Sequence, residues 1–502
     1  MAAQLPSPSS DSPLSSADES LLGEAESKIS VSTSKKRKAE TTTEVESTKR
    51  TKKTSTKIEE EVAEADHSPR SKRKINKKVK VESEVVEDEV KVEDDGDGKV
   101  KVTKKATKTK KKHPIEMIVV ERTQDTALRM GAHVSIAGGI HNAITNVLMI
   151  GANAFALFMK NQRKWENPPL DPEYAKLFVA GCKEHGIDPS TCCLPHGSYL
   201  VNLAHPDADR KKQAYDSFLD DLIRCHKLGI LLYNFHPGNA NATTREEGIR
   251  LIAENINQAH KDPATGKVVA ILETMATLGN TIGGTFKDLK EIIDQVDDKS
   301  RVGVCLDTCH VFAAGYDLRT PEAYAETMAL FDKEIGLQYL KALHVNDSKA
   351  PFSSNRDLHA RIGTGYLGLR AFHNIVNDTR LHGLPMVLET PVDVIGDDGK
   401  KFEDKSIWAR EIKMLESLVG MDVDSDEFKE LEAKLQKEGE AQRKETGDAF
   451  DKKQAKAAKP AKASKAKAAK NGDAETAVKT KAAPRKRKPA KKVETEDEDE
   501  DE

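Results

Sequence analysis

Metal-binding side chains end six short apolar runs in this 502-residue sequence. The runs read LPHGSY, NFHPG, ILET, VCLDTCH, ALHVND and VLET, and the side chains in question are His196, His236, Glu273, Asp307, His344 and Glu389. Three further candidates stand close to two of these runs: His310, Asp357 and His359. Imidazoles and carboxylates without thiolates favour zinc or manganese over magnesium or calcium. Nine candidates exceed the four ligands of one tetrahedral zinc, but they suit two or three ions that share a bridging carboxylate.

Each of these residues also has an ordinary structural interpretation. A single histidine at the end of a strand is more often a hydrogen-bonded core residue than a ligand, and a single glutamate there is more often an ion-pair partner. Six such positions in succession favour one shared site. Buried carboxylates that face one another become protonated unless cations neutralise them. His133, in the first apolar run, is a weaker candidate for which a structural role is an equally good interpretation.

A cluster of metal ions is suited to phosphodiester hydrolysis. Together the ions acidify a water molecule, neutralise phosphate oxygens and stabilise the departing alkoxide. We therefore predict a phosphodiester hydrolase in which Glu273, Asp307 and Glu389 are catalytic. The alternatives are a sugar isomerase or epimerase, whose barrels also carry metal ions, and a non-catalytic nuclear scaffold, because a fold does not determine a function.

The elements that position these residues follow a repeated pattern of strand and helix. Apolar runs with β-branched residues alternate with longer amphipathic stretches, which is typical of βα units. Predicted strands cover residues 129–134, 154–159, 192–196, 231–236, 268–273, 302–307, 339–345 and 386–389. Eight parallel strands can close into a barrel whose strand ends share one face. The predicted fold class is therefore an α/β (β/α)8 TIM barrel, although a doubly wound sheet fits the count nearly as well.

Amphipathic stretches predict helices between these strands, over residues 208–229, 244–260, 285–296 and 320–336. The last of them has clear end signals. Thr320 is a favourable N-cap, Pro321 suits the first turn, and Gly336 suits the residue after the end.

Aromatic residues separate a compact domain from two charged arms. The first aromatic residue is Phe155 and the last is Phe450. A segment without large apolar groups cannot offset the entropy lost on ordering. We predict a disordered arm with basic clusters over 1–126, the barrel over 127–421, and a Lys/Ala-rich tail with an acidic terminus over 422–502. Within that tail, residues 426–445 are expected to form a solvated helix.

Composition limits the class of protein further. The 80 Lys and Arg nearly balance the 83 Asp and Glu, so only the distribution of charge can indicate nucleic-acid binding. Without a long apolar run or a signal-like N-terminus, a soluble intracellular protein with no membrane partner is expected. The 6 cysteines include no CxxC pair, which predicts buried thiols. Basic clusters that begin at residues 35, 71, 104 and 484 predict nuclear import receptors as partners and a nuclear location, with a mitochondrial fraction as an additional location.

Over nearly the whole predicted barrel, the sequence resembles the endonuclease IV family of apurinic/apyrimidinic endonucleases. The matching blocks, in order, are GAHVSIAGG, FALFMKNQRKW, LPHGSYLVNL, NFHPG, VCLDTCHVFAAGYDLRTP and HVNDSK. The resemblance implies a barrel with three zinc ions, with manganese as an alternative at one site. It also implies cleavage of double-stranded DNA on the 5′ side of abasic sites and removal of blocked 3′ ends. A monomer is the default expectation.

The same resemblance assigns the ligands to individual ions. It implies that one ion is held by His196, His236 and Glu273, a second by Glu273, Asp307, His344 and Glu389, and a third by His310, Asp357 and His359. The sequence departs from the family pattern at TMATLG after the bridging glutamate and at IGTG from residue 362. Both departures are expected near the pocket, where they bear on how the substrate is held.

The resemblance further implies that Arg163, Tyr199 and Leu200 contact DNA. An abasic nucleotide must leave the helical stack to reach a pocket floor, and this is easiest where no base is paired. Side chains inserted into the vacated space would keep a bent duplex open. The ordinary interpretation of Tyr199 and Leu200 is loop packing.

Overall fold

The computed structural model describes residues 91–93, 101–103, 120–396 and 399–457. The four basic clusters, and the predicted arm over 1–126 apart from its last residues and two short strands, lie outside these ranges. Those strands, β1 (Lys91–Glu93) and β2 (Lys101–Thr103), form an antiparallel pair. At the predicted start of the barrel, Val120 already packs against the hydrophobic core, so the domain begins before residue 127.

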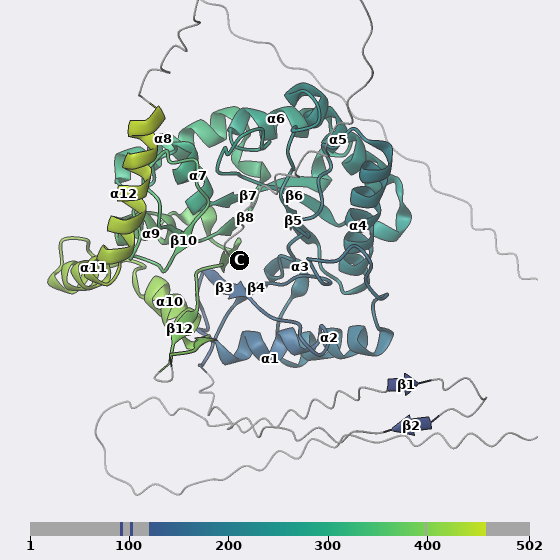
Figure 1. The fold of residues 1–502 in the computed structure, drawn as a ribbon. Coiled ribbons are helices and arrows are strands. Elements are labelled where there is room, and N and C mark those ends of the chain that lie inside the picture. The colour runs from purple at the N-terminus through teal and green to yellow at the C-terminus, as the bar shows by residue number, and fades with distance from the viewer. Residues whose placement is uncertain (1–90, 94–100, 104–119, 397–398, 458–502) are drawn as a thin grey trace, which may run out of the picture. The chain divides into compact units, whose positions relative to one another are not determined.

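Parallel strands form a curled sheet in the order β4-β3-β11-β8-β7-β6-β5 (Figure 1). Their bounds are β3 Arg129–His133, β4 Ala154–Ala156, β5 Leu232–Phe235, β6 Val269–Glu273, β7 Val302–Asp307, β8 Leu340–His344 and β11 Pro385–Leu388. Each lies within or one residue from a predicted strand. The third predicted strand closes the barrel between β4 and β5. Its Cys193 pairs with Phe155 on one side, and its His196 pairs with Asn234 on the other. The predicted TIM barrel is confirmed.

The third barrel strand differs from its prediction over 192–196. Cys192 belongs to a short helix, α3 (Pro189–Cys192), whose first turn is capped by the side chain of Asp188. The strand itself pairs only at isolated bridges. Pro195 explains this, because proline has no backbone N–H to donate to a neighbouring strand.

Helices surround the barrel on its outer side (Figure 1). The longer helices are α1 Asn142–Met149, α2 Pro172–Glu184, α4 Ala208–Lys227, α5 Arg245–Lys261, α6 Phe286–Gln295, α7 Thr308–Ala314, α8 Pro321–Glu334, α9 Gly368–Val376, α10 Ser406–Ser417, α11 Asp426–Glu438 and α12 Glu440–Ala457. The 3-10 turns are η1 Pro263–Thr265, η2 Lys299–Arg301, η3 Leu337–Tyr339 and η4 Thr379–Leu381. In the described part of the chain, no helix is long and apolar enough to cross a membrane.

The predicted ends of α8 are confirmed. Thr320 accepts a hydrogen bond from the backbone N–H of Ala323, and Pro321 is the first helical residue. Gly336 follows the helix with φ of 99°, a conformation that favours glycine.

Two further strand pairs lie in loops that follow barrel strands. One joins β9 (Asp347–Ser348) to β10 (His359–Ala360), and the other joins β12 (Asp393–Ile395) to β13 (Lys401–Glu403). Both pairs are antiparallel. They stand after β8 and β11, on the face where the carboxyl ends of the barrel strands meet.

Two separate apolar clusters hold the barrel together. The smaller cluster fills the barrel interior, and its buried members are Ala156, Leu194, Ile271, Cys305, Ala342 and Val387. The larger lies between the sheet and the helices. Alternate residues of a strand point to opposite sides, so one strand supplies both clusters. All six cysteines are buried free thiols, as predicted.

The segment after residue 421 differs from the expected solvated helix over residues 426–445. Helix α11 is not simply solvated, because Phe428 is fully buried against the barrel domain and lies under the guanidinium of Arg370. The sequence between residues 426 and 457 therefore continues the folded domain. The remainder of the predicted tail, from residue 458, lies outside the described residues.

Candidate metal centre

The structure brings all nine predicted ligands to the carboxyl ends of the barrel strands. Glu273, Asp307 and His344 are the last residues of β6, β7 and β8. His236 and Glu389 directly follow β5 and β11. The other four come from the third barrel strand, helix α7, and the loop that contains β9 and β10: His196, His310, Asp357 and His359.

Glu273 lies at the centre of the cluster and is fully buried. Its Oε2 atom lies 3.2 Å from Nε2 of His196 and 3.6 Å from Nε2 of His236. Its Oε1 atom lies 3.1 Å from Nδ1 of His344 and 3.4 Å from Nδ1 of His310. One carboxylate thus faces two groups of imidazoles with two different oxygens, as a bridging ligand does.

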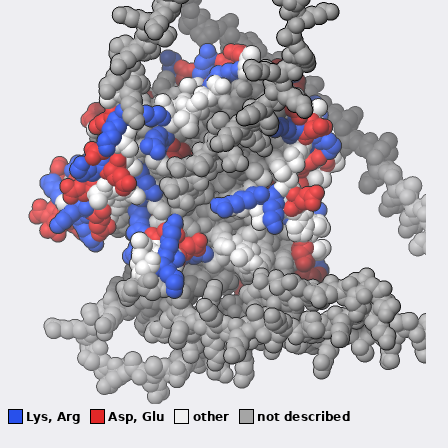
Figure 2. All heavy atoms as spheres, viewed as in Figure 1, with Lys and Arg blue, Asp and Glu red and all other residues white. Residues whose placement is uncertain are grey.

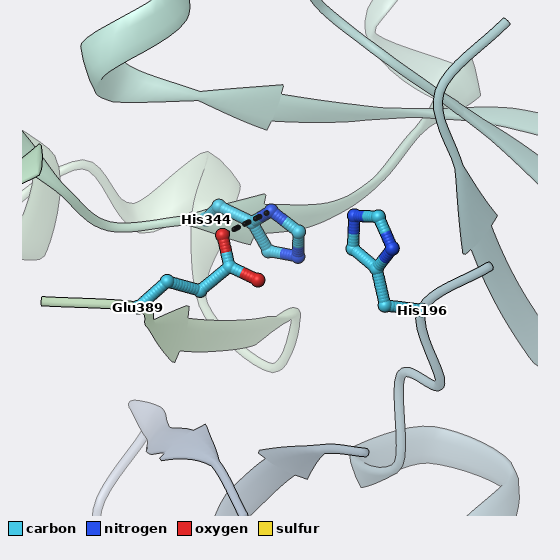
Figure 3. A group of neighbouring side chains, drawn as sticks. All are labelled: His196, His344 and Glu389. Atoms are coloured by element: carbon cyan, nitrogen blue, oxygen red, sulfur yellow. Dashed lines mark ion pairs between the residues drawn. The ribbon is translucent and has the colours of Figure 1, made fainter. Parts of the chain in front are cut away.

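A second group surrounds His344. Its Nδ1 atom lies 3.4 Å from Oε2 of Glu389 (Figure 3). The same atom lies 3.8 Å from Oδ2 of Asp307. Potential ligand atoms of Glu273, Asp307, His344 and Glu389 all lie within 4.8 Å of one another. This is the set that the family resemblance assigns to one ion.

The third group gathers at Asp357. Nε2 of His310 lies 2.9 Å from one oxygen of this carboxylate, and Nε2 of His359 lies 3.0 Å from the other. Cys309 is also close, because potential ligand atoms of Cys309, Asp357 and His359 lie within 4.8 Å of one another. The predicted trio is therefore joined here by a thiol that the sequence prediction did not include.

Backbone carbonyls fix the orientation of two imidazoles. Nδ1–H of His196 donates to the carbonyl of Gly197 over 2.7 Å, and Nδ1–H of His310 donates to the carbonyl of Thr274 over the same distance. Each bond leaves Nε2 as the atom with a free lone pair. Histidine ligands of metal ions are commonly oriented in this way.

The charges of the cluster depend on one another. Burial alone would raise the pKa of Glu273, but the adjacent imidazoles of His344 and His236 hold it well below its ordinary value. Burial alone would lower the pKa of His359, but Asp357 raises it to about 9. An imidazole must lose its proton to bind an ion, so ion binding and proton release are coupled at this site.

One orphaned atom supports a metal site at these residues. The Nε2 atom of His344 is buried and makes no hydrogen bond, whereas the Nε2 atoms of His310 and His359 lie 2.9 and 3.0 Å from the carboxylate oxygens of Asp357. Buried polar atoms are nearly always satisfied, so unpaired ones call for a partner such as an ion. The donor set of imidazoles and carboxylates matches zinc and manganese. The residues present therefore fit the predicted metal cluster.

Sequence reasoning missed two asparagines. Asn234 donates from Nδ2 to Oε2 of Glu273 over 2.5 Å. Asn346 donates from Nδ2 to Oδ2 of Asp307 over 2.7 Å and accepts the backbone N–H of Glu389. Each asparagine stands two residues from a histidine ligand, and strand residues two apart share a face. An amide in the apolar run LLYNF was the available signal.

The predicted DNA-contact residues lie in loops beside the cluster. The ring of Tyr199 lies 5.2 Å from that of His196 and 5.5 Å from that of His236, and its side chain is 53% exposed. Leu200 and Arg163 are also exposed. All three can therefore be reached from solvent.

His133 lies beside the cluster in β3, with its ring 4.5 Å from that of Phe158 and 6.5 Å from that of His196. Burial lowers its pKa to about 4, so the ring is neutral at physiological pH. In the described residues it belongs to none of the groups of close ligand atoms, and its buried Nε2 atom has no hydrogen-bond partner. Both interpretations of His133 therefore stay open.

Comparison with known proteins identifies the family to which the chain belongs. A family model described as xylose isomerase-like TIM barrel matches residues 144–418. Apurinic-apyrimidinic endonuclease 1 of Saccharomyces cerevisiae is 44% identical over 297 residues, which cover 59% of this chain and 78% of that protein. The protein of the same name from Schizosaccharomyces pombe is 45% identical over 59% of this chain and 83% of its own length.

A bacterial relative gives the same result. The probable endonuclease 4 of Campylobacter curvus is 47% identical over 290 residues, which cover 58% of this chain and 97% of that protein. The matched portion of each relative is nearly as long as the barrel domain. The chain belongs to the xylose isomerase-like TIM barrel family and, within it, to the endonuclease IV group of apurinic-apyrimidinic endonucleases.

Proposed function

We propose that this protein is a DNA repair endonuclease that hydrolyses the phosphodiester on the 5′ side of an abasic site. The single observation that carries the proposal is the convergence of nine imidazole and carboxylate ligands around the bridging Glu273. The relatives at 44–47% identity bear endonuclease names, which supports DNA cleavage over sugar isomerisation. The products would be a 3′-hydroxyl and a 5′-deoxyribose phosphate.

Three zinc ions are proposed, with manganese as an alternative at one site. His196, His236 and Glu273 would hold the first; Glu273, Asp307, His344 and Glu389 the second; His310, Asp357 and His359 the third. When bound, the ions supply an activated water and positive charge for the phosphate and the departing 3′ oxygen.

The chain's own residues prepare this chemistry. Without metal ions, the negative charges of Glu273, Asp307 and Glu389 would repel a phosphodiester. Metal ions must therefore bind before the substrate does. Asn234 and Asn346 keep these carboxylates aimed at the centre of the cluster. The strand ends fix the ligands before substrate arrives, and a preorganised site does not have to reorder during reaction.

Recognition of the abasic nucleotide is proposed to use Arg163, Tyr199 and Leu200. The exposed ring of Tyr199, seated against two ligand histidines, can enter the space left when a nucleotide turns out of the duplex. The wedge would then hold the sugar and phosphate over the cluster. Removal of blocked 3′ ends is proposed as a second activity of the same site.

A substitution of the bridging ligand tests the proposal. Glu273→Gln removes one negative charge shared by two ions. Zinc content should fall below that of the wild type, and cleavage of an abasic duplex should fall at least about a hundredfold, the scale seen when even outer partners of a ligand are lost. The measurements are zinc per chain and the rate of nicking at a single abasic site.

Glu173→Gln is the matched control, because the side chain of Glu173 on α2 is 73% exposed and pairs with the equally exposed Lys176. Near-normal zinc content and cleavage in Glu273→Gln would reject the assignment. If the wild type isomerises free ketoses and leaves the abasic duplex whole, the isomerase alternative is correct.

We also propose a nuclear location, with import receptors recognising the basic clusters and a mitochondrial fraction as an additional location. These clusters lie outside the described residues. The protein is proposed to act as a monomer.

A further inference from the structure

One segment connects β8 to α9 and carries two ligands of the third proposed ion. This ligand loop, residues 346–367, includes the β9 and β10 pair and presents Asp357 and His359. Asp357 is the most exposed of the nine ligands, with 46% of its side chain accessible, whereas Asp307 and His344 are fully buried. The position of Asp357 therefore depends on the backbone of the loop more than on packing around its side chain.

Helices α11 and α12, the C-terminal helix pair of residues 426–457, pack on the outer side of this loop. The pair lies beyond residue 418, where the match to the family model ends. In Figure 1 it stands at the edge of the barrel beside α9 and β10. Arg370 of α9 pairs with Glu432 of α11 over 2.9 Å, which fixes one end of the pair to the barrel.

Helix α12 holds the ligand loop by its backbone. Nη1 of Arg443 donates to the carbonyl of Thr364 over 2.5 Å, and the hydroxyl of Tyr366 donates back to the carbonyl of Arg443 over 2.7 Å. The hydroxyl of Thr446 lies within hydrogen-bond distance of the carbonyl of Lys349, and also of the carbonyls of Gln442 and Arg443 on its own helix. Bonds to backbone carbonyls constrain the path of the loop itself.

Helix α11 adds to this hold. Nε2 of Gln436 donates to the carbonyls of Gly363 and Gly365 over 2.8 and 3.2 Å. Nη2 of Arg443 donates to the carbonyl of Gln436. This bond joins the two helices, and both of them contact the loop.

Two glycines of the helix pair make this close approach feasible. A Cβ atom on Gly439 would lie 1.9 Å from the carbonyl oxygen of Thr364, and one on Gly447 would lie 2.5 Å from the hydroxyl of Tyr366. Gly447 lies within α12, where glycine is less stable than alanine, and Gly439 is the residue between the two helices. The presence of glycine at both contact points is explained by the tight packing.

The contacts of helix α12 with the loop are connected to the two ligands by hydrogen bonds. Lys349, whose carbonyl binds Thr446, donates its own N–H to the carbonyl of Leu358 over 2.8 Å. Leu358 stands between Asp357 and His359 in the chain. Two hydrogen bonds, one from the side chain of Thr446 and one between backbone groups, therefore connect the helix to the ligand pair.

We propose that the C-terminal helix pair positions the ligand loop, and that Arg443 and Thr446 are positioning residues for the third metal ion. This inference rests on the proposed three-ion site. It assigns to a segment outside the family model a specific task in metal binding. The other two ions, whose ligands come from the buried strand ends, do not depend on the pair.

Two substitutions in the full chain test this inference. Arg443→Met removes both guanidinium bonds while keeping much of the aliphatic stem, and Thr446→Val removes the hydroxyl with little change of shape. Zinc is withdrawn by graded concentrations of a chelator, and the ions remaining per chain are counted. In the double variant, one ion of the three should leave at about tenfold lower chelator concentration, with the others unchanged. Hydrogen exchange across residues 349–366 should be faster.

Lys444→Met is the matched control, because Lys444 is 73% exposed and pairs with Asp448 on its own helix. Arg443→Lys, which keeps one donor and the charge, should recover part of the loss. The inference is overturned if all ions leave together in step with a lower melting temperature, or if zinc release and loop exchange match those of the control. By contrast, a wild type that holds fewer than three ions or leaves abasic DNA uncut would contradict the proposed function itself.

Discussion

Asparagines at the strand ends show how single residues prepare the metal site. Asn346 contacts the side chain of Asp307 and the backbone of Glu389, and so ties the ends of β7 and β11 together. Asn234 of β5 donates a hydrogen bond to the side chain of Glu273 at the end of the neighbouring strand β6. Both asparagines are fully buried, and each amide group donates to a carboxylate of the cluster, whereas Oδ1 of Asn234 has no hydrogen-bond partner among the described residues. Their role is to orient ligands.

Tyr199 gives a prediction about selectivity for damaged DNA. Tyr199→Ala should retain zinc, because its ring contacts the ligand histidines without binding an ion. The ratio of affinities for abasic and intact duplexes should fall about tenfold, since aromatic stacking contributes roughly 1–3 kcal/mol. Binding of both duplexes is measured at one salt concentration. Tyr174→Ala, on α2, is the control, and an unchanged ratio in Tyr199→Ala would exclude the wedge.

Glu411 gives a prediction about pH. This buried residue of α10 accepts the backbone N–H of Ile362 over 2.8 Å and the hydroxyl of Thr390. Burial raises its pKa from 4.5 to about 7, although the hydrogen bonds from Thr390 and Ile362, and then Arg361, oppose the shift. The folded state therefore binds a proton that the unfolded state releases between these values, so this residue's contribution to stability falls as pH rises through that window.

Glu411→Gln should remove this dependence. Relative to the wild type, the variant should gain about 2–3 kcal/mol in free energy of unfolding between pH 4.5 and 8. Urea unfolding at several pH values gives the difference, from which titrations common to both proteins cancel. A constant difference across the range would show that Glu411 titrates normally in the folded protein.

At the scale of elements, one loop is anchored by a buried cation. Lys160, at the start of the segment that carries Arg163, lies 2.9 Å from Asp220 and 3.2 Å from the buried Asp221 of α4. Nη2 of Arg224 donates to the carbonyl of Pro168 at the other end of the segment over 2.6 Å. Helix α4 thus holds both ends of a loop proposed to contact DNA.

Lys160→Met should lower the free energy of unfolding. Removing the cation leaves Asp221 buried without its partner, which costs about 3 kcal/mol of folding stability. Lys160→Met combined with Asp221→Asn should recover part of that loss, because no uncompensated charge remains. Denaturant unfolding of the two single variants and the double variant forms the test. Equal loss in all three would show that packing, and not charge, is responsible.

The elements also show what sequence can and cannot predict. Strands such as 302–307 were predicted to the residue because a continuous apolar run ended by Asp307 has a simple pattern. The packing of α11 was missed because only Phe428 and Leu435 of that helix are buried, so a mainly charged helix resembles a solvated one. Long-range contacts such as Lys160 with Asp221 leave no local pattern.

The convergence of the candidate ligands could be predicted from the sequence. Strand ends of a parallel barrel must converge, so residue type and position sufficed to predict that these side chains lie together, and their binding of metal ions stays a prediction. Distances, tautomers and the roles of Asn234 and Asn346 depend on side-chain packing across strands. The sequence carries this information only through the complete fold.

For the whole molecule, metal binding should determine much of the stability. Buried carboxylates such as Glu273 and Asp307 repel one another in the absence of cations. Each ion at a hundred times its dissociation constant stabilises the folded state by about 2.7 kcal/mol. Chelation of the wild type should therefore lower the melting temperature by roughly 10 °C or more.

The melting temperature is measured with saturating zinc and with excess EDTA. Glu273→Gln should show a smaller difference between the two conditions, because it binds less zinc. Equal melting temperatures for the wild type with and without EDTA would contradict a structural contribution of the ions.

The ligands span the chain from His196 to Glu389, with one to three contributed by each barrel unit from the third onward. During synthesis, a ribosome would release the first ion's ligands long before Glu389 emerges from the exit tunnel. An early stop codon anywhere before the eighth strand would leave a product unable to complete the second ion's shell. Fragments of this enzyme should consequently be inert toward DNA.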